Sequence, residues 1–453
     1  MSDFDLVVVG SGSGNALVTP ELSGWRIAIV EQGVFGGTCL NRGCIPTKML
    51  VYAADRVVEA SSWDRVGLTG SPPKADWKAI RDRVFGRVDP ISANGREYRR
   101  TGSPNVTLIE ARAEFVGDRA LALSTGGVVT GGHVVLATGA RPGIPPVVAH
   151  SGVPYDTSDT IMRIDALPER LVILGTGFVA VEFAHVFASF GVDVTIVGRS
   201  PLLKRFDHHI RMAFQEIARH RWRVLTDVSP TSLTGSASGI SLGLSDGTSV
   251  SGDRLLVATG RIPNGDRLNL PAAGVSAAPN GRILVDDYQR TSAPGVWALG
   301  DASSEGQLKH LANHEERVVA YNLAHPERMV ASDRRFVPSA VFTHPQIASV
   351  GLTEEQAIAM GRPYVSAVQA YGSTAYGWAM EDTTSICKVL ADPTSRMLIG
   401  AHLMGDQAAT LIQPLIQAMS FGLPAPLMAR GQYWIHPALT EVVENALLAL
   451  PLG

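Results

Sequence analysis

The sequence is short of cysteine and has no surplus of positive charge. Only 3 of its 453 residues are cysteine, too few to hold a fold together with disulfide bonds. Lysine and arginine number 39 against 42 aspartate and glutamate residues, which gives a formal net charge of −3. Nucleic-acid binding usually needs a basic surplus, so we expect no nucleic-acid partner. A hydrophobic content of 45% and 46 glycines are typical of a folded protein rich in tight turns.

The sequence also lacks a long uninterrupted apolar run. Its longest apolar region, from about residue 171 to 197, is interrupted by Glu182, His185 and Asp193, so it does not have the pattern of a membrane span. The first residues, MSDFDLVVVGSG, place acids before their apolar run and lead directly into glycines, which is not the layout of a secretory signal. We therefore expect a cytoplasmic protein without a membrane partner, whose 453 residues form two to four domains.

A pattern of strand, glycine-rich turn, helix and strand occurs twice. The first copy begins with FDLVVVGSGSGNAL and its second strand ends at Glu31, whereas the second copy is RLVILGTGFVAVEFAHVFASFGVDVTIVGR. In such units the glycines let backbone N–H groups approach a pyrophosphate, and an acid about twenty residues later can bind the ribose hydroxyls. We therefore predict two dinucleotide sites. The glycines of the two turns are Gly10, Gly12, Gly14, Gly175 and Gly177.

Two features of the first turn depart from the ideal pattern. Asn15 occupies the third position of the glycine fingerprint, and Pro20 shortens the helix that follows. A purely structural turn is therefore the alternative for this segment. The strand before the turn and Glu31 after it favour the dinucleotide site.

Two proline-containing segments divide the rest of the chain. ARPGIPPV at 140–147 separates the two units, and TGRIPN at 259–264 ends the second. GVWALGDASS at 295–304 has the pattern of a buried strand that ends in a loop, and alternating apolar runs from about Phe336 indicate an antiparallel sheet followed by helices. We predict an α/β protein with two Rossmann-like domains and a C-terminal α+β domain. The four expected regions are residues 1–147, 148–266, 267–335 and 336–453.

The stretch GGTCLNRGCIPTKM carries the most specific pattern in the chain. Four residues separate Cys39 from Cys44, so both sulfurs would face one side and could close a small ring if the segment starts a helix. Lys48 follows Cys44 by four residues, and a cation and a helix N-terminus both stabilise a thiolate, which suits a pair that alternates between dithiol and disulfide. Two buried cysteines or part of a metal site are the alternatives, but no cluster of cysteine or histidine completes a ligand set, so we expect no metal. The third cysteine, Cys387, lies in an alternating strand pattern and is expected in the core.

The same stretch resembles the redox-active segment of the pyridine nucleotide-disulfide oxidoreductases, the family of glutathione reductase and dihydrolipoamide dehydrogenase. The resemblance continues in ATGARP at 137–142, ATGRIPN at 258–264, ALGDAS at 298–303 and HPALTE at 436–441. It implies that FAD binds at the first glycine turn and a pyridine nucleotide at the second. It also implies that the C-terminal domain is an interface domain that joins two copies of the chain.

The resemblance implies roles for the residues around the cysteine pair. Cys44 would lie against the flavin, and Cys39 would attack the substrate. Lys48 would form an ion pair with Glu182 beside the flavin, although Glu182 could instead be an ordinary carboxylate on a helix face. Lys309 would present its backbone N–H to the flavin and leave its side chain in solvent. The other residues implied to bind the cofactors, apart from the glycine turns and Glu31, are Gly37, Thr38, Thr138, Gly139, Gly260 and Asp301.

Near the C-terminus, His436 and Glu441 have the form of a general acid and base held by a carboxylate, which would protonate the leaving thiolate. The resemblance implies that this histidine reaches the cysteines of the other subunit. We therefore expect a homodimer whose active site is shared between subunits. A purely structural histidine is the alternative.

The loop after the second glycine unit indicates which pyridine nucleotide binds. It carries Arg199, Lys204 and Arg205 and lacks the acid that NAD enzymes use for the ribose 2′-hydroxyl, which favours NADPH. An exposed cluster of solvated cations is the alternative. Phe178 stands where relatives often have a tyrosine that covers the nicotinamide, and Val179 follows it in the same expected site.

The expected substrate is a small-molecule disulfide. Glutathione reductases carry arginines after the first glycine turn, whereas residues 15–24 contain no cation and include Glu21. Longer segments such as GQYWIHPALTEVVENALL resemble the members of the family that reduce mycothione, whose neutral sugar groups suit Gln432, Tyr433 and Trp434 better than an arginine clamp. Packing at a subunit interface is the alternative for these three side chains.

Two other functions remain as alternatives. One is a different reductase of this family, dihydrolipoamide dehydrogenase or mercuric reductase. The basic loop argues against the first, and the final residues LLALPLG, which contain no cysteine pair, argue against the second. The other is a flavoprotein that serves as a non-catalytic subunit of a complex, which would have no need for both cysteines and the pair of His436 with Glu441.

Overall fold

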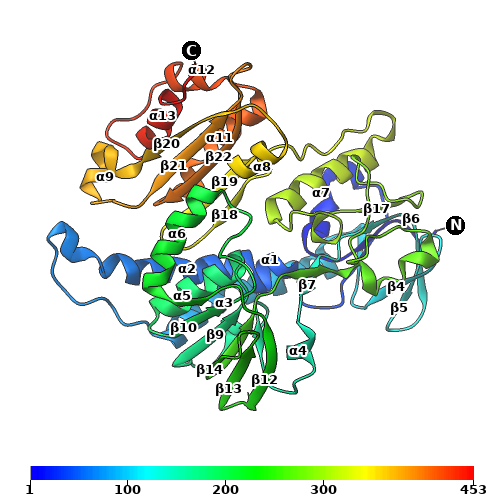
Figure 1. Ribbon diagram of the computed structural model, residues 1–453. Coiled ribbons are helices and arrows are strands. Elements are labelled where there is room, and N and C mark those ends of the chain that lie inside the picture. Colours follow the sequence, from blue (N-terminus) through cyan, green and yellow to red (C-terminus); the bar gives the residue numbers. More distant parts are fainter. Residues whose placement is uncertain (1, 453) are drawn as a thin grey trace.

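The computed structural model describes residues 2–452, which build two largely parallel sheets and one antiparallel C-terminal sheet (Figure 1). The first sheet has seven strands, and its continuous apolar strands β1 and β2 are buried on both faces, as expected for central parallel strands. Strands β3, β2, β1, β6 and β17 run parallel, and β5 and β4 continue from β6 as an antiparallel meander. The bounds are β1 (Phe4–Val9), β2 (Ile27–Val30), β3 (Val106–Ile109), β4 (Ala113–Gly117), β5 (Ala120–Leu123), β6 (Val128–Leu136) and β17 (Val296–Ala298).

The connection between β1 and β2 is not an α-helix. It consists of two short 3₁₀ turns, Ser13–Leu17 and Pro20–Leu22. Pro20 lacks the backbone N–H that a continuing helix would use and sits at the start of the second turn, which explains the early end of the expected helix. The helices of this unit are α1 (Gly37–Arg42), α2 (Cys44–Ala60), α3 (Trp77–Glu97) and α7 (Lys309–Ala324). The two 3₁₀ turns and α7 pack on the sheet, whereas α1, α2 and α3 pack against one another, and α2 also packs against α5 (Phe178–Ser189) of the second unit.

The second parallel sheet has the strand order β11-β10-β9-β15-β8. Helix α5 (Phe178–Ser189) follows β9 and is buried from Ala180 to Phe187, because it packs between this sheet and α2. Helix α6 (His208–Arg221) follows β10. The strands are β8 (Asp156–Thr157), β9 (Arg170–Leu174), β10 (Asp193–Val197), β11 (Arg223–Leu225) and β15 (Arg254–Val257), and a small antiparallel sheet comprises β12 (Pro230–Ser236), β13 (Gly239–Leu244) and β14 (Ser249–Gly252).

The two proline-containing segments that separate the sheets pair with each other. Strand β7 (Ala140–Pro142) runs antiparallel to β16 (Arg261–Pro263), so the chain leaves and re-enters the first unit side by side. The short helix α4 (Pro146–Ala149) follows β7. This pairing supports the predicted boundaries near residues 147 and 266, which remain predictions.

The C-terminal sheet is antiparallel, in the order β18-β19-β22-β21-β20. All eight residues of β22 are buried, and Cys387 on β21 is fully buried, as predicted for a core cysteine; burial raises its pKa to about 12. The strands are β18 (Ser339–Val341), β19 (Gln346–Gly351), β20 (Val365–Ala370), β21 (Ile386–Ala391) and β22 (Leu398–Gly405). The helices are α8 (Glu354–Ala359), α9 (Ala375–Ala379), α10 (Ala408–Leu411), α11 (Gln413–Phe421), α12 (Ala425–Arg430) and α13 (Thr440–Leu448).

A hydrophobic core joins the first two units where α2, α3 and α5 meet. Leu50, Val84, Phe183 and Phe187 are each at most 2% exposed there. This core fixes the cysteine-bearing start of α2 against the start of α5. Within residues 2–452, no helix combines the length and the apolar character needed to cross a membrane.

Candidate functional site

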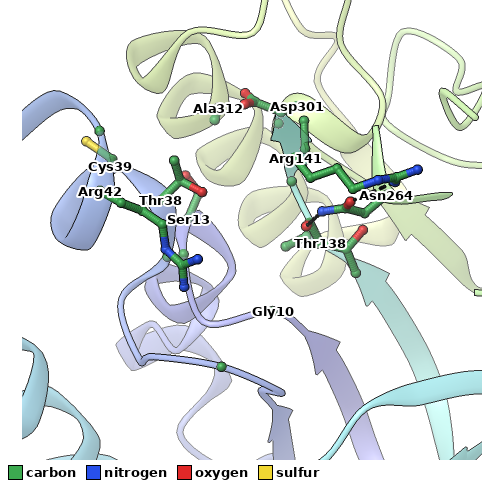
Figure 2. A pocket seen from close by; sticks show the side chains of 18 of the residues that line it. Gly10, Ser13, Thr38, Cys39, Arg42, Thr138, Arg141, Asn264, Asp301 and Ala312 are labelled. Atoms are coloured by element: carbon green, nitrogen blue, oxygen red, sulfur yellow. Dashed lines mark hydrogen bonds between the residues drawn. The ribbon is translucent and has the colours of Figure 1, made fainter. Parts of the chain in front are cut away.

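A cavity of about 460 Å³ lies where the first sheet meets α1, α2, α5 and α7. Figure 2 shows Ser13, Thr38 and Cys39 on one side of it and Thr138, Asn264 and Asp301 on the other. The expected residues that line the cavity are Gly10, Gly12, Glu31, Gly37, Thr38, Cys39, Cys44, Lys48, Thr138, Gly139, Phe178, Val179, Glu182, Asp301 and Lys309. Segments more than 250 residues apart therefore meet in one site.

The first glycine turn is a position of close backbone approach. Gly10 has a φ of 107°, and a Cβ there would lie 2.4 Å from the carbonyl oxygen of Ala137. A Cβ on Gly37 would lie 2.6 Å from the Cα of Gly12, so the turn touches the first residue of α1. Side chains cannot be added at Gly10 or Gly37 without moving backbone, which leaves backbone N–H groups open to the cavity. Gly14 packs beneath the turn, against Val8 and Ala137.

Glu31 closes the loop that follows β2. Its Oε2 accepts hydrogen bonds from the backbone N–H and the hydroxyl of Ser11, at 2.9 and 2.7 Å, and its Oε1 accepts one from the N–H of Gly33 at 2.8 Å. These bonds hold the carboxylate at the cavity edge, beside the glycine turn. This is the arrangement that binding of an adenosine ribose requires.

The two cysteines lie on different helices. Helix α1 ends at Arg42, the backbone turns at Gly43, and Cys44 begins α2, so the expectation that both cysteines share one helix start is wrong. Gly43 has φ −142° and ψ −122°, outside the helical region. Both cysteines are free thiols. The break still leaves both cysteines on the wall of the same cavity, where each thiol changes the acidity of the other.

The two thiols differ in acidity. The hydrogen bond with Cys39 and the positive charge of Lys48 lower the pKa of Cys44 to about 7, against an opposing effect of burial. The pKa of Cys39 is raised, first by the hydrogen bond to Cys44 and then by burial. Cys44 is therefore the more acidic of the two thiols, and Cys39 is the less acidic one.

Lys48 and Glu182 form the ion pair that the resemblance implies. Lys48 Nζ lies 2.5 Å from Glu182 Oε2, and the other carboxylate oxygen accepts a hydrogen bond from the N–H of Phe342 at 3.0 Å. Glu182 is buried, whereas 34% of the Lys48 side chain is exposed. Glu182 thus has the partner that its position on an apolar helix requires, and the ammonium group reaches the cavity.

The cavity also holds polar groups that the protein itself leaves open. The hydroxyl of Thr138 is buried and has no hydrogen-bond partner within residues 2–452. Burial raises the pKa of Asp301, which lies on the cavity wall. A buried hydroxyl and a desolvated carboxyl both call for a polar ligand, and together with the glycine turn they fit a flavin dinucleotide.

The second glycine turn lies outside the cavity, at the start of α5. A Cβ on Gly175 would lie 2.2 Å from the carbonyl oxygen of Ala258, and α5 begins directly after Gly177. Phe178, the first residue of α5, is 42% exposed and lines the cavity, so its ring stands between the two nucleotide sites. Gly260 does not line the cavity. Its carbonyl oxygen accepts a hydrogen bond from the N–H of Gly143, where the two proline-containing segments lie side by side.

The basic loop packs on the second glycine turn. The N–H of Leu203 donates to the carbonyl oxygen of Thr176 at 2.9 Å, and the hydroxyls of Thr176 and Ser200 lie 3.2 Å apart. The loop cations are exposed, and none of them forms an ion pair with a carboxylate of residues 2–452. Three uncompensated cations beside a pyrophosphate turn favour a ligand with an additional phosphate. The cations are Arg199, Lys204 and Arg205.

His436 and Glu441 are paired but lie outside the cavity. His436 Nδ1 is 2.7 Å from Glu441 Oε1, and the second carboxylate oxygen accepts a hydrogen bond from the N–H of Ala438. The histidine side chain is 71% exposed. Its free ring nitrogen faces solvent, so a single chain does not bring it to its own cysteines.

The side chains expected at the substrate differ in their surroundings. Gln432 and Trp434 donate hydrogen bonds to the carbonyl oxygens of Met428 and Ala429, whereas Tyr433 is fully exposed. Trp434 also packs against the C-terminal core, so it contributes to the structure of this domain.

Two contacts near the first turn could not be seen in the sequence. Lys309 Nζ donates to the hydroxyl of Ser13 at 2.7 Å, so the expectation that this side chain lies in solvent is wrong. Arg99, in a short π-helical turn after α3, donates to the side-chain and backbone oxygens of Asn15 at 2.7 and 3.1 Å. A cation therefore does lie beside residues 15–24, although that segment contains none. Each contact joins residues at least 84 positions apart, beyond the reach of any local pattern.

Comparisons with known proteins agree with this site. The family model described as pyridine nucleotide-disulphide oxidoreductase matches residues 4–319, and that of the dimerisation domain of the same proteins matches residues 337–447. Mycothione reductase of Mycobacterium tuberculosis is 51% identical over 460 residues, which cover 99% of this chain and all of the relative. Glutathione reductase of Burkholderia cepacia is 32% identical, with 97% of each chain covered. Among solved structures, the HOCl-induced flavoprotein disulfide reductase RclA from Escherichia coli superposes with a TM-score of 0.87 at 28% identity, covering 98% of this chain and 99% of RclA.

Proposed function

The chain belongs to the pyridine nucleotide-disulphide oxidoreductase family, and on that premise we propose that it reduces mycothione with NADPH. The overall reaction is NADPH + H⁺ + mycothione → NADP⁺ + 2 mycothiol. The observation that carries the proposal is the pair of unequal thiols, Cys39 and Cys44, beside the Lys48 and Glu182 ion pair in a cavity that fits a flavin. Identity of 51% over the full length to a mycothione reductase supports the choice of substrate.

FAD bound in the cavity supplies the relay that passes two electrons from NADPH to the cysteine pair. The backbone of the first glycine turn holds its pyrophosphate, and Glu31 holds the adenosine ribose. Asp301 holds the ribityl chain, while Thr138, Gly139, Gly37 and Thr38 line the same cavity. Phe178, which is 42% exposed and lines the cavity at the start of α5, would have to move aside for a nicotinamide to reach a flavin bound there.

The reduced cysteine pair carries out the disulfide exchange. Cys39 attacks one sulfur of mycothione, which forms a mixed disulfide and releases the first mycothiol thiolate. The thiolate of Cys44 then attacks the sulfur of Cys39, which closes the protein disulfide and releases the second. The Cys39 proton neutralises one leaving thiolate, and the proton taken up with NADPH neutralises the other. The lowered pKa of Cys44 keeps this sulfur ready for the second step.

The proton transfer requires two copies of the chain. We infer that His436 of a second copy accepts the proton of Cys39 and returns it to the leaving thiolate, with Glu441 orienting its ring. The match to the dimerisation domain and the exposure of His436 support a homodimer. Cytoplasmic location is part of the same proposal.

NADPH is proposed as the reductant because of the loop beside the second glycine turn. Arg199, Lys204 and Arg205 offer three cations for a 2′-phosphate, and the loop carries no acid for a free ribose hydroxyl. A dihydrolipoamide dehydrogenase that uses NAD would lack this cluster.

Mycothione is favoured over glutathione disulfide by the surroundings of Asn15. Glutathione carries carboxylates that need cations, but the guanidinium of Arg99 is already bound to Asn15 and to the hydroxyl of Ser103. Burial lowers the pKa of Arg99. Moving this partly buried guanidinium away from its hydrogen-bond partners toward a substrate carboxylate would therefore cost free energy. A neutral sugar disulfide needs no such clamp.

Steady-state kinetics with mycothione, glutathione disulfide and lipoamide, each with NADPH and NADH, test this function. We expect the highest kcat/KM with mycothione and NADPH, and no NADPH oxidation when the disulfide is omitted. A preference for lipoamide with NADH would contradict both specificity assignments. NADPH oxidation at full rate without any disulfide would contradict the reductase itself.

A further inference from the structure

The side chain of Lys309 brings a second lysine to the cysteine pair. Lys309 lines the cavity and donates a hydrogen bond to the neutral hydroxyl of Ser13 at 2.7 Å. Within residues 2–452, no carboxylate oxygen lies within 4.0 Å of its Nζ. The three cations on the two cysteine-bearing helices are all paired, Arg42 with Asp159 at 3.3 Å, Lys48 with Glu182 at 2.5 Å and Arg56 with Glu59 at 2.5 Å. No carboxylate of residues 2–452 therefore neutralises the charge of Lys309, which acts on the pyrophosphate proposed to bind at the first glycine turn and on other groups in the cavity.

The hydroxyl of Ser13 places this charge at the beginning of α1. Ser13 follows Gly12, whose backbone touches Gly37, the first residue of α1. Cys39 stands two residues further along the same helix. Figure 2 shows Ser13 next to Thr38, on the side of the cavity that carries Cys39. Helix α7 begins at Lys309 and packs on the turn Ser13–Leu17. The backbone of Lys309 and its ammonium group are therefore both held against this turn.

We propose that Lys309 stabilises the thiolate of Cys39, as Lys48 stabilises the thiolate of Cys44. This role rests on the proposed disulfide exchange, in which Cys39 must lose its proton to attack the substrate. The negative charge of Cys44 opposes that ionisation, because two like charges would stand side by side. A cation on the far side of Cys39 offsets this repulsion without neutralising Cys44.

The acidities of the two thiols support separate roles for the two lysines. The hydrogen bond with Cys44 and burial raise the pKa of Cys39, and the positive charge of Lys309 lowers it. Lys48 lowers the pKa of Cys44. Each sulfur thus has its own lysine, one from α2 and the other from α7, 261 residues later in the chain.

Other charged groups face Cys39 from the elements packed around it, and Lys309 acts on some of them. Its charge lowers the pKa of Asp301 and Glu316, both of which burial raises. Removing the lysine therefore changes the carboxyl that is proposed to hold the ribityl chain, so flavin content must be measured together with thiol acidity. The charged and titratable groups that line the cavity together with Cys39 are Glu31, Arg42, Cys44, Lys48, Arg112, Arg141, Asp159, Glu182, Arg261, Arg267, Asp301 and Lys309.

Alkylation of the reduced holoenzyme measures the acidity of Cys39 directly. The protein is reduced with NADPH, treated with iodoacetamide between about pH 7 and about pH 11 so that the raised pKa of Cys39 lies within the range, and digested with trypsin. Cleavage after Arg42 puts Cys39 and Cys44 on different peptides, so mass spectrometry reports the two rates separately. The variants are Lys309→Met, Lys309→Arg and, as a matched surface control, Lys78→Met, whose side chain is 76% exposed.

Lys309→Met should slow alkylation of Cys39 about tenfold near neutral pH and raise its midpoint by about one pH unit. Lys309→Arg should restore most of the rate, and Lys78→Met should leave it unchanged. An unchanged Cys39 midpoint in Lys309→Met with FAD retained would overturn the proposal. Loss of FAD from this variant would assign the lysine to the cofactor instead, and would overturn it as well. No mycothione enters the experiment, so its result does not depend on the identity of the substrate.

Discussion

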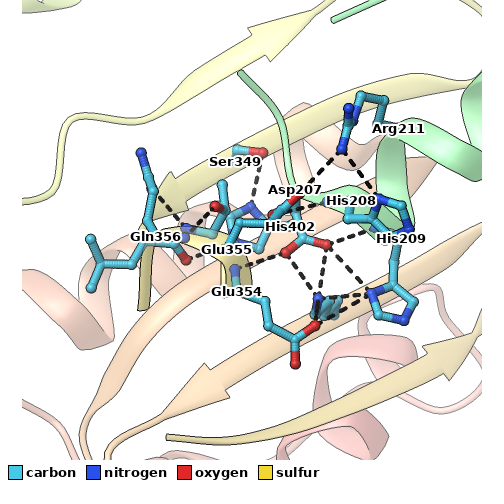
Figure 3. Close-up of polar contacts among 12 residues, drawn as sticks. Asp207, His208, His209, Arg211, Ser349, Glu354, Glu355, Gln356 and His402 are labelled. Atoms are coloured by element: carbon cyan, nitrogen blue, oxygen red, sulfur yellow. Dashed lines mark hydrogen bonds and ion pairs between the residues drawn. The ribbon is translucent and has the colours of Figure 1, made fainter. Parts of the chain in front are cut away.

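Two lysines in this molecule pair with buried carboxylates, and they lie in very different surroundings. Lys388 on β21 is completely buried and donates to both oxygens of Asp207 at 2.9 Å and to Glu354 at 2.8 Å, with His209 also within 2.9 Å (Figure 3). Lys48 has one carboxylate partner, and a third of its side chain faces the cavity. The ammonium group of Lys388 therefore has several protein partners and no contact with solvent, whereas that of Lys48 has one carboxylate partner and also faces the cavity.

The sealed cluster joins two parts of the chain, whereas the open pair serves a ligand site. Asp207 caps α6 in the second unit, and Glu354 and Lys388 belong to the C-terminal unit. Burial alone would raise the pKa of Asp207, but the hydrogen bonds from Lys388 hold it below its ordinary value. A buried ion pair with every position filled cannot lose one partner without leaving an uncompensated charge, and one with free space beside it is available for chemistry.

Removal of Lys388 should give the largest effect on stability. Lys388→Met leaves Asp207 as a buried charge without its cation, which should cost about 3 to 5 kcal/mol of unfolding free energy. Urea denaturation measures the loss, and Lys78→Met provides an exposed control that should change it by less than about 0.5 kcal/mol. Adding Asp207→Asn should recover part of the loss. A single variant that loses less than about 1 kcal/mol would remove the distinction between the two lysines.

Removal of Lys48 should separate stability from activity. Lys48→Met should lose less than half as much unfolding free energy as Lys388→Met, because water in the cavity can reach the lysine position. Its rate of disulfide reduction should fall about a hundredfold, since a nearby cation lowers a thiol pKa by about one to three units. Denaturation and steady-state assays on the same preparation test both halves. A variant that is strongly destabilised yet catalytically normal when folded would reverse the comparison.

The exposed cations of the basic loop, which precedes Asp207 in the chain, extend the comparison to positive charges without a carboxylate partner within residues 2–452. Arg199→Ala, Lys204→Ala and Arg205→Ala should leave stability unchanged, because these side chains have no ion-pair partner within residues 2–452. The variant that removes the phosphate contact should raise KM for NADPH about tenfold, the loss expected for one charge-assisted hydrogen bond. KM for NADH should not change. Equal effects on both nucleotides would contradict recognition of the 2′-phosphate.

A smaller effect is expected from pH. Because the pKa of Cys44 is lowered to about 7, its thiolate fraction increases as pH rises through neutrality. The long-wavelength absorbance of reduced holoenzyme, which needs a thiolate beside the flavin, should therefore strengthen between about pH 6 and about pH 8. Absorbance that weakens over this range would contradict the ionisation of Cys44.

Much of the site follows from local sequence, and the rest depends on folding. The glycine turns and the pair of Cys39 and Cys44 could be predicted, because each belongs to a motif with fixed spacing. The partnership of Lys48 with Glu182 was implied by the resemblance to the family. The contact of Lys309 with Ser13 could not be predicted, because the two residues are 296 positions apart in the sequence. The helix break at Gly43 was also hidden, since spacing alone does not distinguish one helix from two.

The C-terminal sheet shows why alternation can mislead. Strand alternation would place Lys388 on the face opposite to the buried Cys387, where solvent is expected. Both residues are fully buried, because β21 is covered on both faces. A buried lysine is stable at this position because its ammonium group pairs with Asp207 of the second unit and with Glu354 of the same unit.

The spectrum of oxidised holoenzyme carrying Cys39→Ser or Cys44→Ser tests the central claim most directly. If Cys44 is the charged sulfur beside the flavin, Cys39→Ser should show the long-wavelength absorbance without any reductant, and Cys44→Ser should lack it. The opposite pattern, with the absorbance present in Cys44→Ser and absent in Cys39→Ser, would exchange the roles of the two thiols and contradict the account.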